Sequence, residues 1–173
     1  MKRFFYALLF TIFFFGMGLS TTISYAEEKE TKELIATSGQ CGENVYWKIE
    51  GTTLTIYGTG DMYDYEGDWY STDNLPDYLK VRATTTDSSG ETEQNIVPAN
   101  SLINKVIIKD GVTNIGEYAL YNLGNDATEV QIGKSVTSIK EDGCYSFNGK
   151  RITIPGNVRE LGIDAFAYSS LES

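Results

Sequence analysis

The densest group of side chains able to do chemistry is the run DMYDYEGDWY at residues 61–70. Carboxylates from Asp61, Asp64, Glu66 and Asp68 alternate there with aromatic rings. A pair of carboxylates flanking a glycosidic bond can hydrolyse it, and carboxylate oxygens can also bind calcium. The spacing matches no calcium-loop motif, so we expect a solvated acidic turn whose rings pack on its neighbours. A carbohydrate-active enzyme or a carbohydrate-binding protein remains the alternative for this cluster.

The rest of the sequence offers little catalytic chemistry. It contains no histidine, the commonest general base and metal ligand. It also contains no glycine-rich phosphate loop, no CxxC and no HExxH motif. We therefore predict no catalytic residue, no metal site and no cofactor. Cys41 and Cys144 each sit in an apolar pattern, which predicts buried free thiols, with a disulfide between them as the alternative.

The first residues have the layout of a secretory signal peptide. MKRFFYALLFTIFFFGMGLSTTISYA begins with two cations, continues with an apolar run and ends in small residues at Ser24 and Ala26. We expect cleavage after Ala26, which makes the protein secreted or attached to the cell surface, with no membrane segment after cleavage. An uncleaved anchor is the alternative, although the apolar run is shorter than a spanning helix needs.

The net charge is strongly negative. The whole chain carries −10, and loss of residues 1–26, which hold two cations and no acid, takes the charge to −12. Such a surface repels nucleic acid and anionic lipid. A partner attracted by the overall charge should therefore be cationic.

Three similar stretches begin at Val106, Val130 and Ile152, which are 24 and 22 residues apart. Each has apolar residues two apart, as in a strand, and then three or four apart, as in a tighter turn. The shared columns are Ile108/Ile132/Ile154, Val112/Val136/Val158, Ile115/Ile139/Leu161, Ala119/Gly143/Ala165 and Leu120/Cys144/Phe166. One such coil cannot bury its apolar side alone, so successive coils must stack into a shared core.

These repeats resemble the BspA-like family of bacterial surface leucine-rich repeats, with the pattern L-x-x-I-x-I-P-x-x-V-x-x-I-x-x-x-A-F-x-x-C. Residues 152–166 fit best, including Pro155, whereas Lys109 and Gly133 replace this proline in the other copies. The segment SGQCGENVYWKIEGTTLTIYGTGDMYDY at residues 38–65 is similar to the part of the family that precedes its first repeat. The resemblance implies a mainly β fold: a short right-handed solenoid with parallel strands and an N-terminal β-hairpin cap. It also implies protein binding or adhesion at the bacterial cell surface, to a host or matrix protein, without catalysis.

The residues of the cap, without the resemblance, also predict a hairpin. Val45, Trp47 and Ile49 alternate on one strand, Leu54 and Ile56 alternate on the return strand, and a turn at residues 50–52 joins them. We expect this hairpin to cover the open end of the first coil.

The expected organisation has five parts: a signal peptide at 1–26, a flexible lead-in at 27–37, the cap at 38–70, a polar insertion loop at 71–101, and a solenoid of about three repeats at 102–173. The insertion contains TTTDSSGETEQN, which has almost nothing to bury, so disorder is expected, with a functional loop as the alternative. The sequence stops at residues 171–173, where a further coil would start. We interpret this as a shortened form of a longer protein, with self-association through the open C-terminal coil or a non-functional remnant as alternatives.

The candidate partner-binding residues lie between the buried strand positions, on the concave face of the expected solenoid. They are Lys105, Ile107, Lys109, Glu129, Gln131, Arg151 and Thr153, with Gly133 and Pro155 in the same columns. In register, Lys105, Glu129 and Arg151 would form a ladder of alternating charge, worth roughly 0.2–1 kcal/mol a pair. Such a ladder can set the register of the strands, and the same face can bind a partner.

Overall fold

The computed structural model describes residues 29–66, 74–98, 102–125 and 128–172. The expected signal peptide lies outside these ranges. Within them, no helix is long and apolar enough to cross a membrane.

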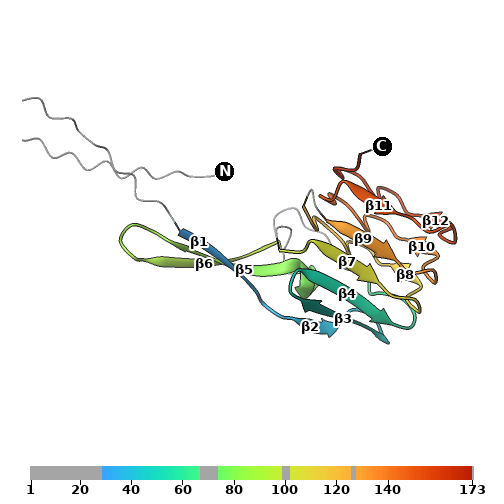
Figure 1. The fold of residues 1–173 in the computed structure, drawn as a ribbon, viewed down its shortest axis with the longest axis horizontal. Helices are drawn as coiled ribbons and strands as arrows, with labels where there is room; N and C mark the ends of the chain where they lie inside the picture. Colours follow the sequence, from blue (N-terminus) through green and yellow to red (C-terminus); the bar gives the residue numbers. More distant parts are fainter. Residues whose placement is uncertain (1–28, 67–73, 99–101, 126–127, 173) are drawn as a thin grey trace, which may run out of the picture.

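The largest element is a six-stranded sheet with the strand order β11-β9-β7-β4-β3-β2 (Figure 1). Its strands are β2 (Ser38–Gln40), β3 (Val45–Glu50), β4 (Thr53–Gly58), β7 (Lys105–Ile108), β9 (Glu129–Ile132) and β11 (Arg151–Thr153). β4, β7, β9 and β11 pair in parallel, whereas β2, β3 and β4 pair antiparallel. The expected hairpin therefore joins the same sheet as the repeats, and the sheet is mixed.

A second, narrower sheet joins the same repeats. β8 (Asn114–Ile115), β10 (Ser138–Ile139) and β12 (Glu160–Leu161) pair in parallel, with Ile115 opposite Ile139 and Ile139 opposite Leu161. In the main sheet Val106 lies opposite Val130, and Val130 lies opposite Ile152. The predicted alignment is therefore confirmed for the residues that head the repeats and for the column Ile115/Ile139/Leu161. The core residues Val106, Val112, Ile115 and Ile139 are fully buried.

Each repeat closes through a tight turn that contains two residues in the left-handed region. These residues are Tyr118 and Asn122, Asp142 and Ser146, and Asp164 and Tyr168, with φ between 50° and 55°. Backbone bonds then join successive turns: Leu120 N–H donates to Gly143 O (2.8 Å) and Cys144 N–H to Ala165 O (2.8 Å). Asn and Asp tolerate this conformation better than most residues. These backbone turns explain why the apolar residues of each repeat become three or four residues apart after the strand.

The cap pairs with the first repeat and does not only cover its end. After β4 the chain continues alongside the first repeat, with a parallel bridge between Gly60 and Val112 and a bond from Thr113 N–H to Gly60 O (2.9 Å). Leu54 and Ile56 lie opposite Val106 and Ile108. The segment from β4 to Gly60 therefore pairs in parallel with the first repeat, which the columns of the repeats did not predict.

Two expectations are wrong in the described residues: the flexible lead-in and the polar loop both contain strands. β1 (Lys29–Leu34), β5 (Lys80–Thr86) and β6 (Thr92–Pro98) form a separate antiparallel sheet, here called the arm, with the order β1-β5-β6. In Figure 1 the arm extends away from the repeats. The polar composition of these segments predicted disorder, but threonine-rich strands can pair through their backbones with little burial.

The arm is joined to the core by a short 3₁₀ helix, η1 (Asp77–Leu79). η1 buries Tyr78 and Leu79, and the Tyr78 ring packs edge-on against Trp47 with their centroids 5.4 Å apart. The Tyr78 hydroxyl donates to Ala119 O (3.0 Å) in the first repeat. This part of the insertion therefore belongs to the hydrophobic core.

Candidate functional site

The candidate site is the side of the main sheet that faces away from the core, here called the outer face. Exposure alternates along the strands, so that Glu129 and Gln131 of β9 are exposed while Val130 between them is buried. The register places the following side chains on this face: Arg151 and Thr153 of β11, Glu129 and Gln131 of β9, Lys105 and Ile107 of β7, Thr53, Thr55 and Tyr57 of β4, and Tyr46, Lys48 and Glu50 of β3. Lys109 follows the end of β7 on the same alternation.

The structure brings the predicted partner-binding residues together in two rows. Lys105, Glu129 and Arg151 lie opposite one another in one row, and Ile107, Gln131 and Thr153 in the next. Across the part of the chain that the structure describes, no ion pair joins the charged row. The three charged residues of the predicted ladder are therefore neighbours in the register, and none of them forms an ion pair with another described residue.

The cap strands extend the outer face beyond the residues chosen from sequence. Tyr46 and Tyr57 lie opposite each other on β3 and β4, with ring centroids 6.1 Å apart, and each residue is 40 % exposed. Lys48 forms an ion pair with Glu50 (2.8 Å), and this hydrogen bond and charge raise the pKa of Lys48. The alternation of apolar and polar residues in VYWKIE and TLTIYG also predicts which side chains of the cap face outward, although only its buried positions were predicted from sequence.

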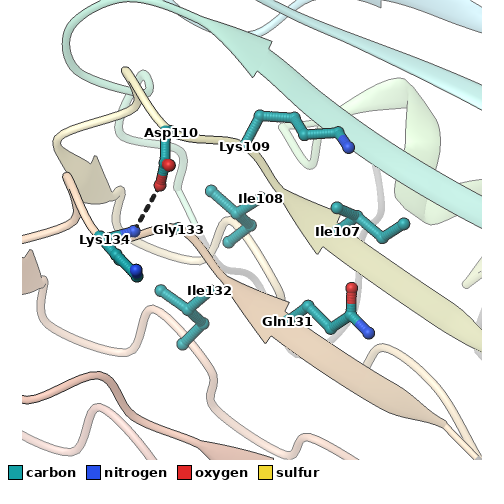
Figure 2. Close-up of a pocket in the computed structure, with 8 residues that line it drawn as sticks. All are labelled: Ile107, Ile108, Lys109, Asp110, Gln131, Ile132, Gly133 and Lys134. Carbon is teal, nitrogen blue, oxygen red and sulfur yellow. Dashed lines mark hydrogen bonds between the residues drawn. The ribbon is translucent and has the colours of Figure 1, made fainter.

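A shallow depression of about 250 Å³ lies over the ends of β7 and β9 (Figure 2). Ile107 on β7 and Gln131 on β9 lie side by side at its edge, and Lys109 and Lys134 supply cationic groups. The Asp110 carboxylate accepts a bond from the Lys134 backbone N–H (2.6 Å). Position 133 is glycine because a Cβ there would lie 2.7 Å from the carbonyl carbon of Lys109.

The acidic cluster near residue 64 serves the fold. The Asp61 carboxylate accepts a bond from the Thr113 hydroxyl. Asp64 forms an ion pair with Lys140 Nζ (2.7 Å), and the hydrogen bond between these two side chains raises the pKa of Lys140. Asp64 also accepts a hydrogen bond from the Glu117 backbone N–H (3.1 Å). These contacts join the end of the cap to the first two repeats. Two of the four acids of this cluster, Asp61 and Asp64, thus have partners within the fold.

The last two acids of this cluster are Glu66 and Asp68. Glu66 accepts a bond from Asn74 Nδ2 (3.3 Å) at the surface, whereas Asp68, Trp69 and Tyr70 lie outside the described residues. In the described ranges no group of three or more Cys, Asp or Glu side chains is placed to hold a metal ion.

The two thiols are free and buried, as the apolar pattern predicted. Burial raises the pKa of both Cys41 and Cys144 to about 12. A thiol reacts as its thiolate, so neither cysteine has the environment of a nucleophile.

Comparison with known proteins gave two similarities. Residues 94–173 match a family model described as "BspA type Leucine rich repeat region (6 copies)". The crystal structure of a leucine-rich repeat protein from Eubacterium ventriosum ATCC 27560 is similar over 83 % of this chain, with 21 % sequence identity and a TM-score of 0.44. The chain spans 37 % of the length of that protein. No curated protein matched the chain.

Proposed function

We propose, from the match of residues 94–173 to a model of the BspA-type leucine-rich repeat region, that this chain is a protein-interaction module without catalysis. It binds a protein partner on the outer face through Lys105, Ile107, Lys109, Glu129, Gln131, Arg151 and Thr153. The repeats form coils of a right-handed solenoid, because crossover connections between parallel strands are right-handed in about 98 % of cases. The leader-like first residues support secretion or surface attachment, where the partner would be a host or matrix protein.

One observation carries this proposal. The polar side chains of the predicted set make no intramolecular hydrogen bond or ion pair with any described residue. Away from the outer face, by contrast, polar side chains make contacts within the protein. Asn114 Oδ1 accepts a hydrogen bond from Met62 N–H (2.8 Å), and Asp64 forms an ion pair with Lys140. Side chains that are exposed, aligned and unpaired are available to another molecule, and stacked repeats commonly bind along such a surface.

The proposal is tested by selecting displayed random peptides on the purified protein and comparing two triple variants. The outer-face variant carries Lys109→Ala, Gln131→Ala and Arg151→Ala. The control variant carries Lys29→Ala, Gln94→Ala and Arg159→Ala, which are also exposed, make the same charge change and lie outside the outer face. We expect the selected peptides to lose at least about tenfold in affinity for the outer-face variant, about 1.4 kcal/mol, and to keep their affinity for the control. Equal binding to both variants would contradict the proposed function.

A further inference from the structure

The charge of the outer face is opposite to the charge of the whole chain. The protein carries −10, but this face presents four cations against two acids. The cations are Lys48, Lys105, Lys109 and Arg151, and the acids are Glu50 and Glu129. A surface-bound partner responds to charges within about one Debye length, ~8–10 Å at physiological salt. The expectation of a cationic partner, which came from net charge, therefore does not hold for this surface.

Three of the four cations are available to a partner. Lys48 is already held by Glu50, whereas Lys105, Lys109 and Arg151 have no ion pair within the described part of the chain. Lys105 and Arg151 lie two strands apart across the sheet, or about 10 Å. Lys105 and Lys109 lie four residues apart in the direction of β7, or about 13 Å, which corresponds to four residues of an extended chain at about 3.3 Å each.

Apolar groups lie between and beside these cations. Ile107 is half-buried between Lys105 and Lys109, and Ile132 lies in the adjoining depression. On the cap side, Lys109 adjoins β4 through the bond from its N–H to Ile56 O (2.9 Å), next to the exposed Tyr46 and Tyr57 rings. A ligand that contacts all three cations must therefore also cover apolar surface.

We infer that the partner of the outer face presents an acidic, extended peptide segment. Two of its carboxylates, four residues apart, meet Lys105 and Lys109, while Arg151 attracts the segment from about 10 Å to one side, and its apolar side chains rest on Ile107 and on the Tyr46–Tyr57 pair. This inference rests on the proposed function and specifies the partner of the same site. An anionic polysaccharide would satisfy the cations but would leave the apolar groups without apolar contacts, so the peptide is the better match.

The test uses a synthetic peptide with glutamates at every fourth position and leucine, tyrosine and serine between them, and a matched peptide with lysine at the same positions. We expect only the acidic peptide to bind, and its affinity to fall about tenfold between about 0.05 M and about 0.5 M salt, because screening weakens exposed charge pairs. Lys109→Glu with Arg151→Glu should weaken binding by at least about tenfold, whereas Lys29→Glu with Arg159→Glu, which makes the same charge change elsewhere, should not. The milder pair Lys109→Gln with Arg151→Gln should fall between the two, and thermal melts should be similar for all variants.

Several outcomes would overturn the inference: no binding of the acidic peptide, equal binding of the basic peptide, or an unchanged affinity in the charge-reversed variant. Heparin binding as tightly as the peptide, with the same dependence on Lys109 and Arg151, would assign the face to anionic polysaccharide instead. The peptide selection described above separates this inference from the proposed function. Selected peptides that require the outer face but lack acidic residues would overturn the inference alone, whereas peptides that ignore the outer face would overturn both.

Discussion

Asp64 shows how a residue that looks catalytic in sequence is used by the fold. Its two oxygens accept from Lys140 Nζ and from Glu117 N–H, so it joins the end of the cap to the first and second repeats. Asp64→Ala should lower the free energy of unfolding by about 1 kcal/mol, because both bonds are lost but both partners remain near solvent. Urea unfolding of the purified protein would measure the change.

Asp64→Asn is the matched control, because its side-chain oxygen can still accept from Glu117 N–H while the ion pair is lost. We expect its loss of stability to be about half that of Asp64→Ala. Turnover of a polysaccharide by the unmodified protein that disappears in Asp64→Asn at unchanged stability would contradict the structural role and support the hydrolase alternative.

The buried thiols give stability a defined dependence on pH. The pKa of Cys144 is about 12 in the folded protein against an ordinary value of 9.0, so the unfolded chain loses this proton first as the pH rises. The contribution of this thiol is complete below pH 9 and is lost as the pH rises toward about 12. At pH 10.5 the loss should be about 2 kcal/mol.

The measurement is urea unfolding at pH 7.5 and pH 10.5 for the wild type and for Cys144→Ala. Tyr118, whose pKa a hydrogen bond to Asp142 raises to about 12, contributes with the same sign in both proteins. Only the difference between the two pH dependences therefore reports on the thiol. Equal slopes would show that the Cys144 pKa is not raised by folding.

At the scale of elements, η1 is the contact that makes the insertion part of the core. Tyr78 packs on Trp47 of the cap and donates to Ala119 O of the first repeat, and its side chain is fully buried. Burial also raises the pKa of Tyr78, so the hydroxyl stays protonated as a donor. Tyr78→Phe should cost about 1–2 kcal/mol, because it leaves a buried carbonyl without its donor.

Tyr78→Ala should cost more, about 3–5 kcal/mol, because it also leaves a cavity beside Trp47. Both values come from chemical unfolding monitored by the fluorescence of the tryptophans. If Tyr78→Phe were neutral and Tyr78→Ala cost less than about 1 kcal/mol, η1 would be a surface turn and not a part of the core.

The repeats and the cap were predictable from sequence because both bury side chains at a fixed period. Val45, Trp47 and Ile49 alternate with exposed residues, and the columns headed by Val106 recur with little change. The arm was not predictable on the same basis, because β1 and β6 are exposed along nearly their whole length. Backbone pairing between distant segments, such as Leu34 with Val81, leaves no periodic signal in either segment.

The candidate site was predictable in part for a related reason. The columns of the repeats identified Lys105, Glu129 and Arg151 as neighbours, and the register agrees. The columns could not include Tyr46 and Tyr57, because the cap pairs with the repeats through β4 without sharing their pattern. The local charge of the outer face also depends on which strands are adjacent, which composition does not report.

Across the whole molecule, stability should be highest in the middle of the stack and lower toward both ends. The most deeply buried side chains belong to β3, β4, β7 and the turns of the first two repeats, including Leu54, Ile56, Ile108 and Phe147. Among the side chains of the arm whose burial is described, only Val81 and Ala83 are buried, and the third repeat leaves Leu161 57 % and Ile163 71 % exposed. Regions with little buried apolar area open locally at low free energy.

Hydrogen exchange measured by mass spectrometry should therefore show three classes of amides. Backbone amides of β4 and β7 should exchange slowest, those of β11 and β12 faster, and those of β1 and β6 fastest. The amides of β1 and β6 should exchange at least about a hundredfold faster than those of β4, a difference of about 2.7 kcal/mol in the free energy of opening. Trp47→Ala should lower protection in β3, β4 and β7 together, because β4 pairs with both neighbours and a large buried ring is lost. It should leave β1 and β6 unchanged, since these strands already open independently of the core. Equal protection of β6 and β7, or a loss confined to β3, would show that the arm, cap and repeats unfold in a different order from the one their packing predicts.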